Sequence, residues 1–290
     1  MTVQTARHDE VEIAYEVEGP PDGEPLLLIM GLGLQMLFWP DGFRKLLVDR
    51  GFRVARFDNR DVGLSTHLSW LGTPRPTVFL TRRWSGYRMT DLADDAVAVL
   101  DGLGWDSAHV VGVSLGGMIA QTLAVRHPDR VRTLTSISST PSPRIGRPDP
   151  RVLPVLWSRG ATDRRTAAEH VVRIFRVIGS PGYPREEAWL REVAGQSYDR
   201  AHDPIGVRRQ LAAIVSSGDR RPLLAGLHMP VLVVHGDSDL LVRPSGGRAT
   251  ADAVPGARLI TFPGMGHDLP AALQPAIADE IGLLAHSRSR

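Results

Sequence analysis

The chain has 290 residues, 42% of them hydrophobic and 23% charged, a globular composition that excludes wholesale disorder. Its 34 lysine and arginine residues nearly balance 32 acidic residues, for a net charge of +2. The arginines are interleaved with aspartates along the chain, which argues against a nucleic-acid-binding surface. Since cysteine is absent, disulfides, thiol nucleophiles and cysteine-ligated metals are excluded.

The first residues and the longest apolar stretch predict neither an export signal nor a membrane helix. Charged residues from Arg7 to Glu12 interrupt the place where a signal peptide needs its apolar region. The apolar stretch 26–39 contains Gly31 and Gly33 and is shorter than the ~20 apolar residues that a membrane helix requires. We expect a cytoplasmic protein with no integral membrane segment, unless a leader has been removed.

Strand-like and helix-like segments alternate over the first 140 residues in the manner of a parallel sheet. Residues 11–17 alternate apolar and charged side chains, which predicts an exposed antiparallel edge strand. Residues 26–30 form a continuous apolar run, which predicts a strand buried on both faces. The segments expected next are helix 43–50, strand 52–57, helix 90–103, strand 108–113, helix 115–127 and strand 131–137.

The alternation stops between about residues 140 and 222. Helical stretches at 167–177 and 185–193 are separated there by proline and glycine clusters, and no strand-like run is present. The alternation resumes with strand 231–234, helix 244–253, strand 258–262 and a helix from about Pro270. We therefore predict an α/β core formed by residues 1–139 and 223–290, with residues 140–222 inserted as a helical cap after the sixth core strand.

The segment Gly112-Val113-Ser114-Leu115-Gly116 fits the pattern G-x-S-x-G and lies between a predicted strand and a predicted helix. This is the context of a nucleophile elbow, in which a tight turn strains the serine backbone and glycines prevent collisions. Ser114 would lie at a helix N-terminus, where the helix dipole favours an oxyanion. The pattern predicts Ser114 as a nucleophile; the alternative is a glycine-rich turn with a capping serine.

A serine nucleophile needs a base, and in this arrangement an acid and then a histidine follow the serine, each after a strand. His267 lies in a glycine-rich loop after strand 258–262 and is predicted to be the general base. Asp237 and Asp239 both follow strand 231–234. The chemistry of the sequence alone leaves both aspartates open as the acid.

Motifs along the whole chain, in matching order and spacing, together resemble the α/β-hydrolase superfamily. They are Gly31, the loop Asp58-Asn59-Arg60-Asp61-Val62-Gly63-Leu64-Ser65, the elbow with Gly117, Gly236-Asp237-Ser238-Asp239 and Gly264-Met265-Gly266-His267. The resemblance implies a mostly parallel sheet flanked by helices. It also implies that Asp239 is the acid of a catalytic triad, and that the backbone N–H groups of Leu32 and Leu115 form an oxyanion hole.

Two positions depart from the family pattern. Met30 stands where many relatives have a histidine that braces the oxyanion loop, so the rigidity of this loop is less assured. Asp61 stands where the Asp58–Ser65 loop usually has glycine. The segment Gly31-Leu32-Gly33 could open a dinucleotide-binding fingerprint, but position 36 is Met rather than Gly, which disfavours that interpretation.

A serine nucleophile with a histidine base implies acyl transfer to the enzyme and then to water. The motifs resemble most an actinobacterial esterase group that includes the aclacinomycin methylesterases, so we expect a serine carboxylesterase acting on small to medium, largely apolar esters. The alternatives are a hydrolase of another acyl bond (thioester, amide, lactone or C–C), a cofactor-free perhydrolase, and a non-catalytic ligand receptor.

Four residues are expected to contact the substrate: Trp84, Trp157, Phe175 and Met265. The aromatic residues could equally form the core of the cap itself. Because no group of His, Asp and Glu has metal-ligand spacing in the sequence, we expect no metal. We also expect no cofactor. As a serine esterase, the protein should bind a small-molecule ester. The sequence leaves open whether the protein is a monomer or a homodimer.

Overall fold

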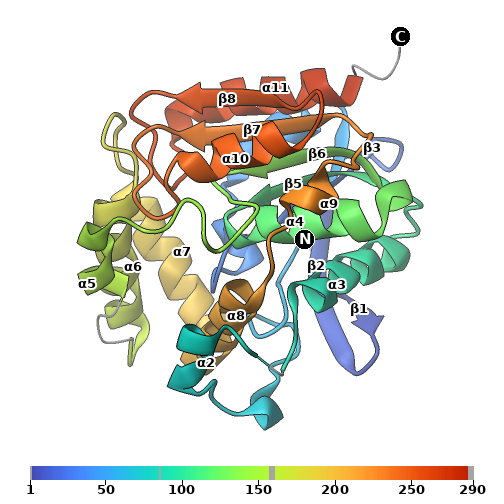
Figure 1. Ribbon diagram of the computed structural model, residues 1–290. Coiled ribbons are helices and arrows are strands. Elements are labelled where there is room, and N and C mark those ends of the chain that lie inside the picture. The colour runs from blue at the N-terminus through green and yellow to red at the C-terminus, as the bar shows by residue number, and fades with distance from the viewer. Residues whose placement is uncertain (1, 85, 157–160, 287–290) are drawn as a thin grey trace.

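A central eight-stranded sheet has the strand order β1-β2-β4-β3-β5-β6-β7-β8 (Figure 1). The computed structural model describes residues 2–84, 86–156 and 161–286. The strands are β1 (Gln4–His8), β2 (Val11–Glu18), β3 (Glu24–Ile29), β4 (Phe52–Phe57), β5 (Ala108–Val113), β6 (Val131–Ile137), β7 (Val231–Gly236) and β8 (Arg258–Phe262). The pairings β1–β2 and β2–β4 are antiparallel, and all others are parallel. The predicted mostly parallel sheet is confirmed.

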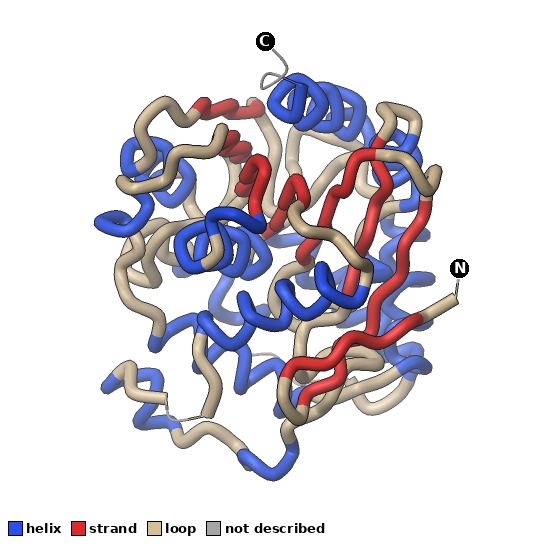
Figure 2. The backbone as a smooth tube through the Cα atoms, turned by 90° about the vertical axis from the view of Figure 1, so that its right-hand side faces the viewer, coloured by secondary structure: helices blue, strands red, loops and turns tan. Residues whose placement is uncertain are grey.

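Helices cover both faces of the sheet, as Figures 1 and 2 show. Outside the segment between β6 and β7, the α-helices are α1 (Asp41–Val48), α2 (Pro76–Thr81), α3 (Met89–Gly102), α4 (Leu115–Arg126), α10 (Ser245–Ala253) and α11 (Gln274–His286). Successive residues of β3 enter two separate cores: Leu27 and Ile29 pack with α3 and α4, and Leu26 and Leu28 pack with α1 and α11. Burial on both faces explains the continuous apolar run of this strand.

The predicted edge strand is antiparallel, but it is not at the edge. β1 pairs outside β2, from Gln4 opposite Tyr15 to His8 opposite Val11, and a turn at Asp9 (φ 54°) joins the two strands. β1 was missed because only Ala6 of its five residues is buried, so it carries no apolar alternation. Short polar strands are typical of sheet edges, because they discourage pairing with other chains.

The segment between β6 and β7 is helical in the parts that the structure describes, and no strand occurs there. Its helices are α5 (Leu153–Leu156), α6 (Arg164–Ile178), α7 (Glu187–Arg200), α8 (Pro204–Ser216) and α9 (Arg221–Leu224). The arrowheads of β7 and β8 point toward the side of the molecule that α5, α6 and α7 occupy (Figure 1). These helices therefore lie toward the carboxyl ends of the parallel strands, where α/β proteins carry their sites.

The longest helix that the sequence analysis did not predict is α8. Asp203 caps it by accepting hydrogen bonds from the N–H groups of Ile205 and Gly206, and Pro204 is its first residue. Both features are helix-start signals that the sequence displays. Among the described helices, none combines the length and apolar character needed to cross a membrane.

Candidate active site

Ser114 occupies a strained turn between β5 and α4, with φ 57° and ψ −118°. Both flanking glycines are required by close backbone contacts. A Cβ on Gly112 would lie 2.1 Å from the Gly116 carbonyl oxygen, and a Cβ on Gly116 would lie 2.0 Å from the Ile29 carbonyl oxygen. The turn presents Ser114 at the first turn of α4, as a nucleophile elbow requires.

His267 and Asp239 meet at the ends of β8 and β7. The Nδ1–H of His267 donates to Asp239 Oδ2 over 2.7 Å, and the Asp239 side chain has no exposed surface. Asp239 Oδ1 accepts hydrogen bonds of 2.9 Å from the N–H groups of Leu241 and Val242. Because a carboxylate can only accept, Nδ1 carries the proton in this arrangement, and Nε2 of a neutral imidazole keeps the lone pair that a general base needs.

Asp237, the other candidate acid, makes different contacts. Its Oδ1 accepts hydrogen bonds from the Gly264 N–H at 2.7 Å and from the Ser238 hydroxyl at 2.8 Å. These bonds join the loops after β7 and β8. The structure therefore brings Asp239, and not Asp237, into contact with His267, and Asp237 acts as a turn residue.

The loop that carries His267 is held by the end of α6. The His267 N–H donates to the Ile178 carbonyl oxygen at 2.7 Å, and the Gly266 N–H donates to Ser180 Oγ at 2.8 Å. The Ser180 hydroxyl in turn donates to the Asp268 carboxylate. Burial raises the pKa of Asp268 above its ordinary value, although the Ser180 hydrogen bond opposes that rise. Sequence reasoning missed Ser180, because nothing local in the sequence links it to His267.

The residues expected to form the oxyanion hole lie beside Ser114. A Cβ on Gly31 would be 3.3 Å from Ser114 Cβ, so the loop that begins at Gly31 passes close to the serine. Leu115 is the first residue of α4, and its N–H has no acceptor within the helix. In the described part of the chain, the Leu32 N–H makes no hydrogen bond to another residue. Both N–H groups are thus available to bind an oxyanion.

The loop Asp58–Ser65 is anchored below the oxyanion loop by buried polar contacts. Asp58 accepts hydrogen bonds from the N–H groups of Met36 at 2.8 Å and Leu64 at 3.0 Å, and it pairs with Arg200 of α7. Burial raises the pKa of Asp58, and Arg200 opposes this effect. The Asn59 side chain donates to the Met30 carbonyl oxygen at 3.0 Å. This loop therefore supports the oxyanion loop directly.

Asp61, the departure from the family pattern, forms a buried ion pair with Arg209 of α8. The Nε and Nη2 groups of Arg209 donate to the two Asp61 oxygens at 2.8 and 2.7 Å, and Nη2 also reaches Asp203 at 2.9 Å. Asp61 has φ 69°, a conformation that favours glycine. The residue that forms this ion pair therefore has a strained backbone.

One group among the described residues lies close enough together to hold a metal ion, with ligand atoms within 4.8 Å of one another. It consists of Asp61, His67 and Asp203. Spacing in the sequence could not reveal this group, since Asp203 is far along the chain. Arg209 already neutralises both carboxylates through short hydrogen bonds. The carboxylates of Asp61 and Asp203 therefore already bind Arg209, and we derive no metal chemistry from this group.

The four residues expected to contact substrate lie in different surroundings. Trp84 is partly buried against the core beneath α3 and α4, and Met265 is fully buried in the core beneath α1 and α11. Phe175 is partly exposed on α6. Trp157 lies outside the described residues. Substrate contact remains a prediction for all four.

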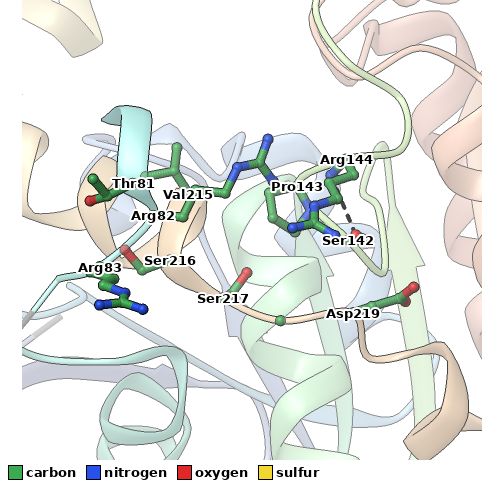
Figure 3. Close-up of a pocket in the computed structure, with 11 residues that line it drawn as sticks. Thr81, Arg82, Arg83, Ser142, Pro143, Arg144, Val215, Ser216, Ser217 and Asp219 are labelled. Carbon is green, nitrogen blue, oxygen red and sulfur yellow. Dashed lines mark hydrogen bonds between the residues drawn. The ribbon is translucent and has the colours of Figure 1, made fainter. Parts of the chain in front are cut away.

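Figure 3 shows a pocket of about 320 Å³ between the end of α2, the loop after β6 and the end of α8. Arg82 extends from the end of α2 toward Pro143 and Arg144, and the Arg144 N–H donates to Ser142 Oγ at 3.3 Å (Figure 3). The lining residues are Thr81, Arg82, Arg83, Ser142, Pro143, Arg144, Val215, Ser216, Ser217, Gly218 and Asp219. Ser114, Asp239 and His267 are not among them, so this polar pocket is not the place where the expected catalytic residues meet.

Comparisons with known proteins identify the family. Residues 24–270 match the family model described as the alpha/beta hydrolase fold. The chain is 31% identical to the rhodomycin D methylesterase DnrP of Streptomyces peucetius and 32% identical to DauP of Streptomyces sp. (strain C5), covering 100% of this chain and 99% of each relative. The esterase RhEst1 from Rhodococcus sp. ECU1013 has the same fold, with a TM-score of 0.76, 22% identity and 99% of each chain covered.

The matches agree with the resemblance inferred from the motifs and with the sheet and helices of the structure. The full-length relatives are named esterases, which confirms the expected ester-hydrolysing activity. This chain belongs to the α/β-hydrolase family and is an ester-hydrolysing enzyme.

Proposed function

We propose that this protein is a serine carboxylesterase in which Ser114, His267 and Asp239 form the catalytic triad. The observation that carries the proposal is the short hydrogen bond, 2.7 Å, between His267 Nδ1 and a fully buried Asp239. The strained elbow at Ser114 supplies a nucleophile at the same edge of the sheet. A buried carboxylate bound to Nδ1 fixes the tautomer that leaves Nε2 as a base.

The reaction proceeds through an acyl-enzyme. Ser114 Oγ attacks the ester carbonyl carbon while His267 Nε2 takes the hydroxyl proton, and the N–H groups of Leu32 and Leu115 bind the resulting oxyanion. His267 then gives the proton to the departing alcohol. Water, deprotonated by His267, attacks the acyl-enzyme, and collapse of the second tetrahedral intermediate releases the carboxylic acid and restores Ser114.

We assign small to medium, largely apolar carboxylic esters as the substrate class. Two full-length relatives are named rhodomycin D methylesterases, which favours a methyl ester as one substrate of this chain. The helices between β6 and β7 lie toward the carboxyl ends of the strands (Figure 1), which supports the proposal that residues 140–222 form a cap over the site.

The triad is tested with p-nitrophenyl acetate and butyrate. We expect Ser114→Ala and His267→Ala each to lower kcat by several orders of magnitude, because the two residues act as one unit. The double variant should lose little more than either single variant. Labelling with a fluorophosphonate and mass spectrometry should place the adduct on Ser114, whereas activity retained by Ser114→Ala would refute the mechanism.

A further inference from the structure

We propose that Gln210 of α8 is a positioning residue for the oxyanion hole, acting through the turn that carries the Leu32 N–H. This inference rests on the proposed function, in which that N–H binds the oxyanion. It adds a role for the segment between β6 and β7, because this segment then contributes to the chemical step as well as covering the site.

The oxyanion loop begins with a four-residue turn. The Leu34 N–H donates to the Gly31 carbonyl oxygen at 3.3 Å, and Gly33 has φ 68°. Leu32 is not among the residues with positive φ, so the turn has the conformation of type II, which requires positive φ at its third residue alone. A type II turn differs from the commoner type I mainly by the rotation of its central peptide, here the one between Leu32 and Gly33.

Gln210 holds that central peptide in place. Its Oε1 accepts the Gly33 N–H at 2.9 Å, and its Nε2 donates to the Arg60 carbonyl oxygen at 2.9 Å. The side chain has no exposed surface, so water cannot replace either partner. Because one end of the amide must accept and the other must donate, only one orientation of the side chain satisfies both bonds.

A second residue of α8 packs on the same turn. A Cβ on Gly33 would lie 2.9 Å from a methyl group of Val207, one helical turn before Gln210. The peptide between Met30 and Gly31 is also held, since Asn59 donates to the Met30 carbonyl oxygen at 3.0 Å. The peptide that carries the Leu32 N–H, between Gly31 and Leu32, therefore lies between two fixed peptides, one held by Asn59 and one held by Gln210 of α8.

This arrangement compensates for the missing histidine at position 30. Without Gln210, the central peptide can rotate, which weakens the turn and its Leu34 to Gly31 hydrogen bond, so the neighbouring peptide that carries the Leu32 N–H loses one of its two supports. An oxyanion exists only in the tetrahedral intermediates and the transition states that lead to them, so the loss should fall on kcat rather than on ground-state binding. Removing a whole oxyanion donor costs about 10²–10³ in kcat, and loosening one should cost less, about tenfold.

The test compares Gln210→Met with Gln121→Met. Gln121 is the matched control, because it is also fully buried and also uses both ends of its amide, toward Ser136 and Arg220. The measurements are kcat and KM with p-nitrophenyl butyrate, the melting temperature, and the inhibition constant of an alkyl trifluoromethyl ketone, which forms an oxyanion on the serine. We expect Gln210→Met to lower kcat about tenfold, with KM within twofold, and to weaken the ketone by a similar factor.

Two further variants keep the test decisive if Gln210→Met folds poorly. Gln210→Glu keeps an acceptor for the Gly33 N–H and should recover part of kcat, whereas Val207→Ala should give a smaller loss with the same signature. Gln121→Met should lower the melting temperature without changing kcat or ketone affinity. Unchanged kcat and ketone affinity in Gln210→Met and Val207→Ala, a loss confined to KM, or an equal loss in Gln121→Met would overturn the inference. An active Ser114→Ala enzyme would instead refute the underlying mechanism.

Discussion

Asp237 and Asp239 lie two residues apart after β7, and their hydrogen bonds give them different roles. Asp239 contacts the His267 imidazole and is fully buried, while Asp237 accepts the Gly264 N–H and joins two turns. The side chain of one aspartate can therefore stabilise an imidazolium, and the side chain of the other cannot. The sequence left this choice to family resemblance, because both residues follow the same strand at nearly the same place.

Asp239→Asn should lower kcat by about 10⁴, because a neutral amide neither stabilises the imidazolium nor selects the Nδ1–H tautomer. Asp237→Asn is the matched control, since the same change is made two residues away, and it should retain most of the activity. Steady-state kinetics of both purified variants with p-nitrophenyl butyrate decide the question. Comparable losses in both, or a larger loss in Asp237→Asn, would show that the acid is assigned wrongly.

The hydrogen bonds of His67 predict that this residue contributes to the stability of the fold in a pH-dependent way. Its Nε2 faces the Gly63 carbonyl oxygen and its Nδ1 faces the Asp203 carboxylate, each at 3.0 Å, so both nitrogens donate only when the ring is protonated. Burial lowers the pKa of His67, but the hydrogen bonds to Gly63 and Asp203 outweigh it and leave the pKa raised. This stabilisation is complete below the unfolded pKa of about 6.5 and is lost as the pH rises through the higher folded value.

We therefore expect His67→Gln to lower the melting temperature most near pH 6 and progressively less toward pH 9. His228→Gln is the control, because His228 is exposed and makes no hydrogen bond within the described chain. Scanning calorimetry of both variants and the unaltered protein across this range gives the comparison. A destabilisation of His67→Gln that does not change with pH would contradict the ionised pair.

At the scale of elements, burial decided what the sequence revealed. The bounds of the buried strands β4, β5 and β6 agree with the prediction to the residue, and β3 begins two residues and ends one residue before the predicted segment. β5 and β6 pair with parallel neighbours on both sides and are almost wholly buried, so their apolar runs have clear ends. β1 and α8 were missed, since β1 is a polar edge strand and α8 has only a mixed pattern that includes Gly206 and two arginines.

Motifs identified the candidate nucleophile and base, because both depend on local turns rich in glycine. The supporting residues act across long separations and have no local pattern. Gln210 is 177 residues from Gly33, and Ser180 is 86 residues from Gly266. Only the packing of the segment between β6 and β7 onto the sheet brings these pairs together. Site support of this kind is therefore a property of the folded chain rather than of any one motif.

The loop after α6 yields a prediction about Ser180. Its hydroxyl accepts the Gly266 N–H and donates to Asp268, so Ser180→Ala should loosen the loop that carries His267. Hydrogen bonds to charged groups contribute about 1.5–3 kcal/mol, and we expect kcat to fall about tenfold or more. Ser197→Ala is the control, since Ser197 is a buried serine of the same segment whose hydroxyl has no partner in the described structure. Equal kcat values in the two variants would exclude this role.

At the scale of the whole molecule, the segment between β6 and β7 touches three loops of the candidate site. The end of α6 binds the His267 loop, α7 supplies Arg200 to Asp58, and α8 supplies Gln210 to the oxyanion turn. The proposed cap is attached at these three points, so its movement away from the core as a rigid lid would loosen the groups that we expect to perform the reaction. We therefore propose that the cap is a second wall of the site, continuous with the loops that carry the expected catalytic residues.

A wall of this kind should also select among esters, and Phe175 and Trp189, two of its aromatic residues, allow a test. Trp189 packs edge-to-face on Phe38, with ring centroids 6.2 Å apart, and belongs to the surroundings of the core beneath α1 and α11. Phe175 is partly exposed and is not among the described residues that pack against either core. Phe175 is therefore the better candidate for contact with a substrate, and Trp189 for structural support.

We expect Phe175→Ala to change the ratio of kcat/KM between p-nitrophenyl butyrate and octanoate by about tenfold, since a methylene-sized contact contributes about 1–3 kcal/mol and a whole ring is removed. Trp189→Ala should instead lower the melting temperature and depress all esters alike, because it removes packing that every substrate requires. A chain-length series from acetate to decanoate, measured with both variants at a temperature where each is folded, separates these effects. If Phe175→Ala depresses all esters uniformly, its ring supports the cap, and selectivity must be set by other residues.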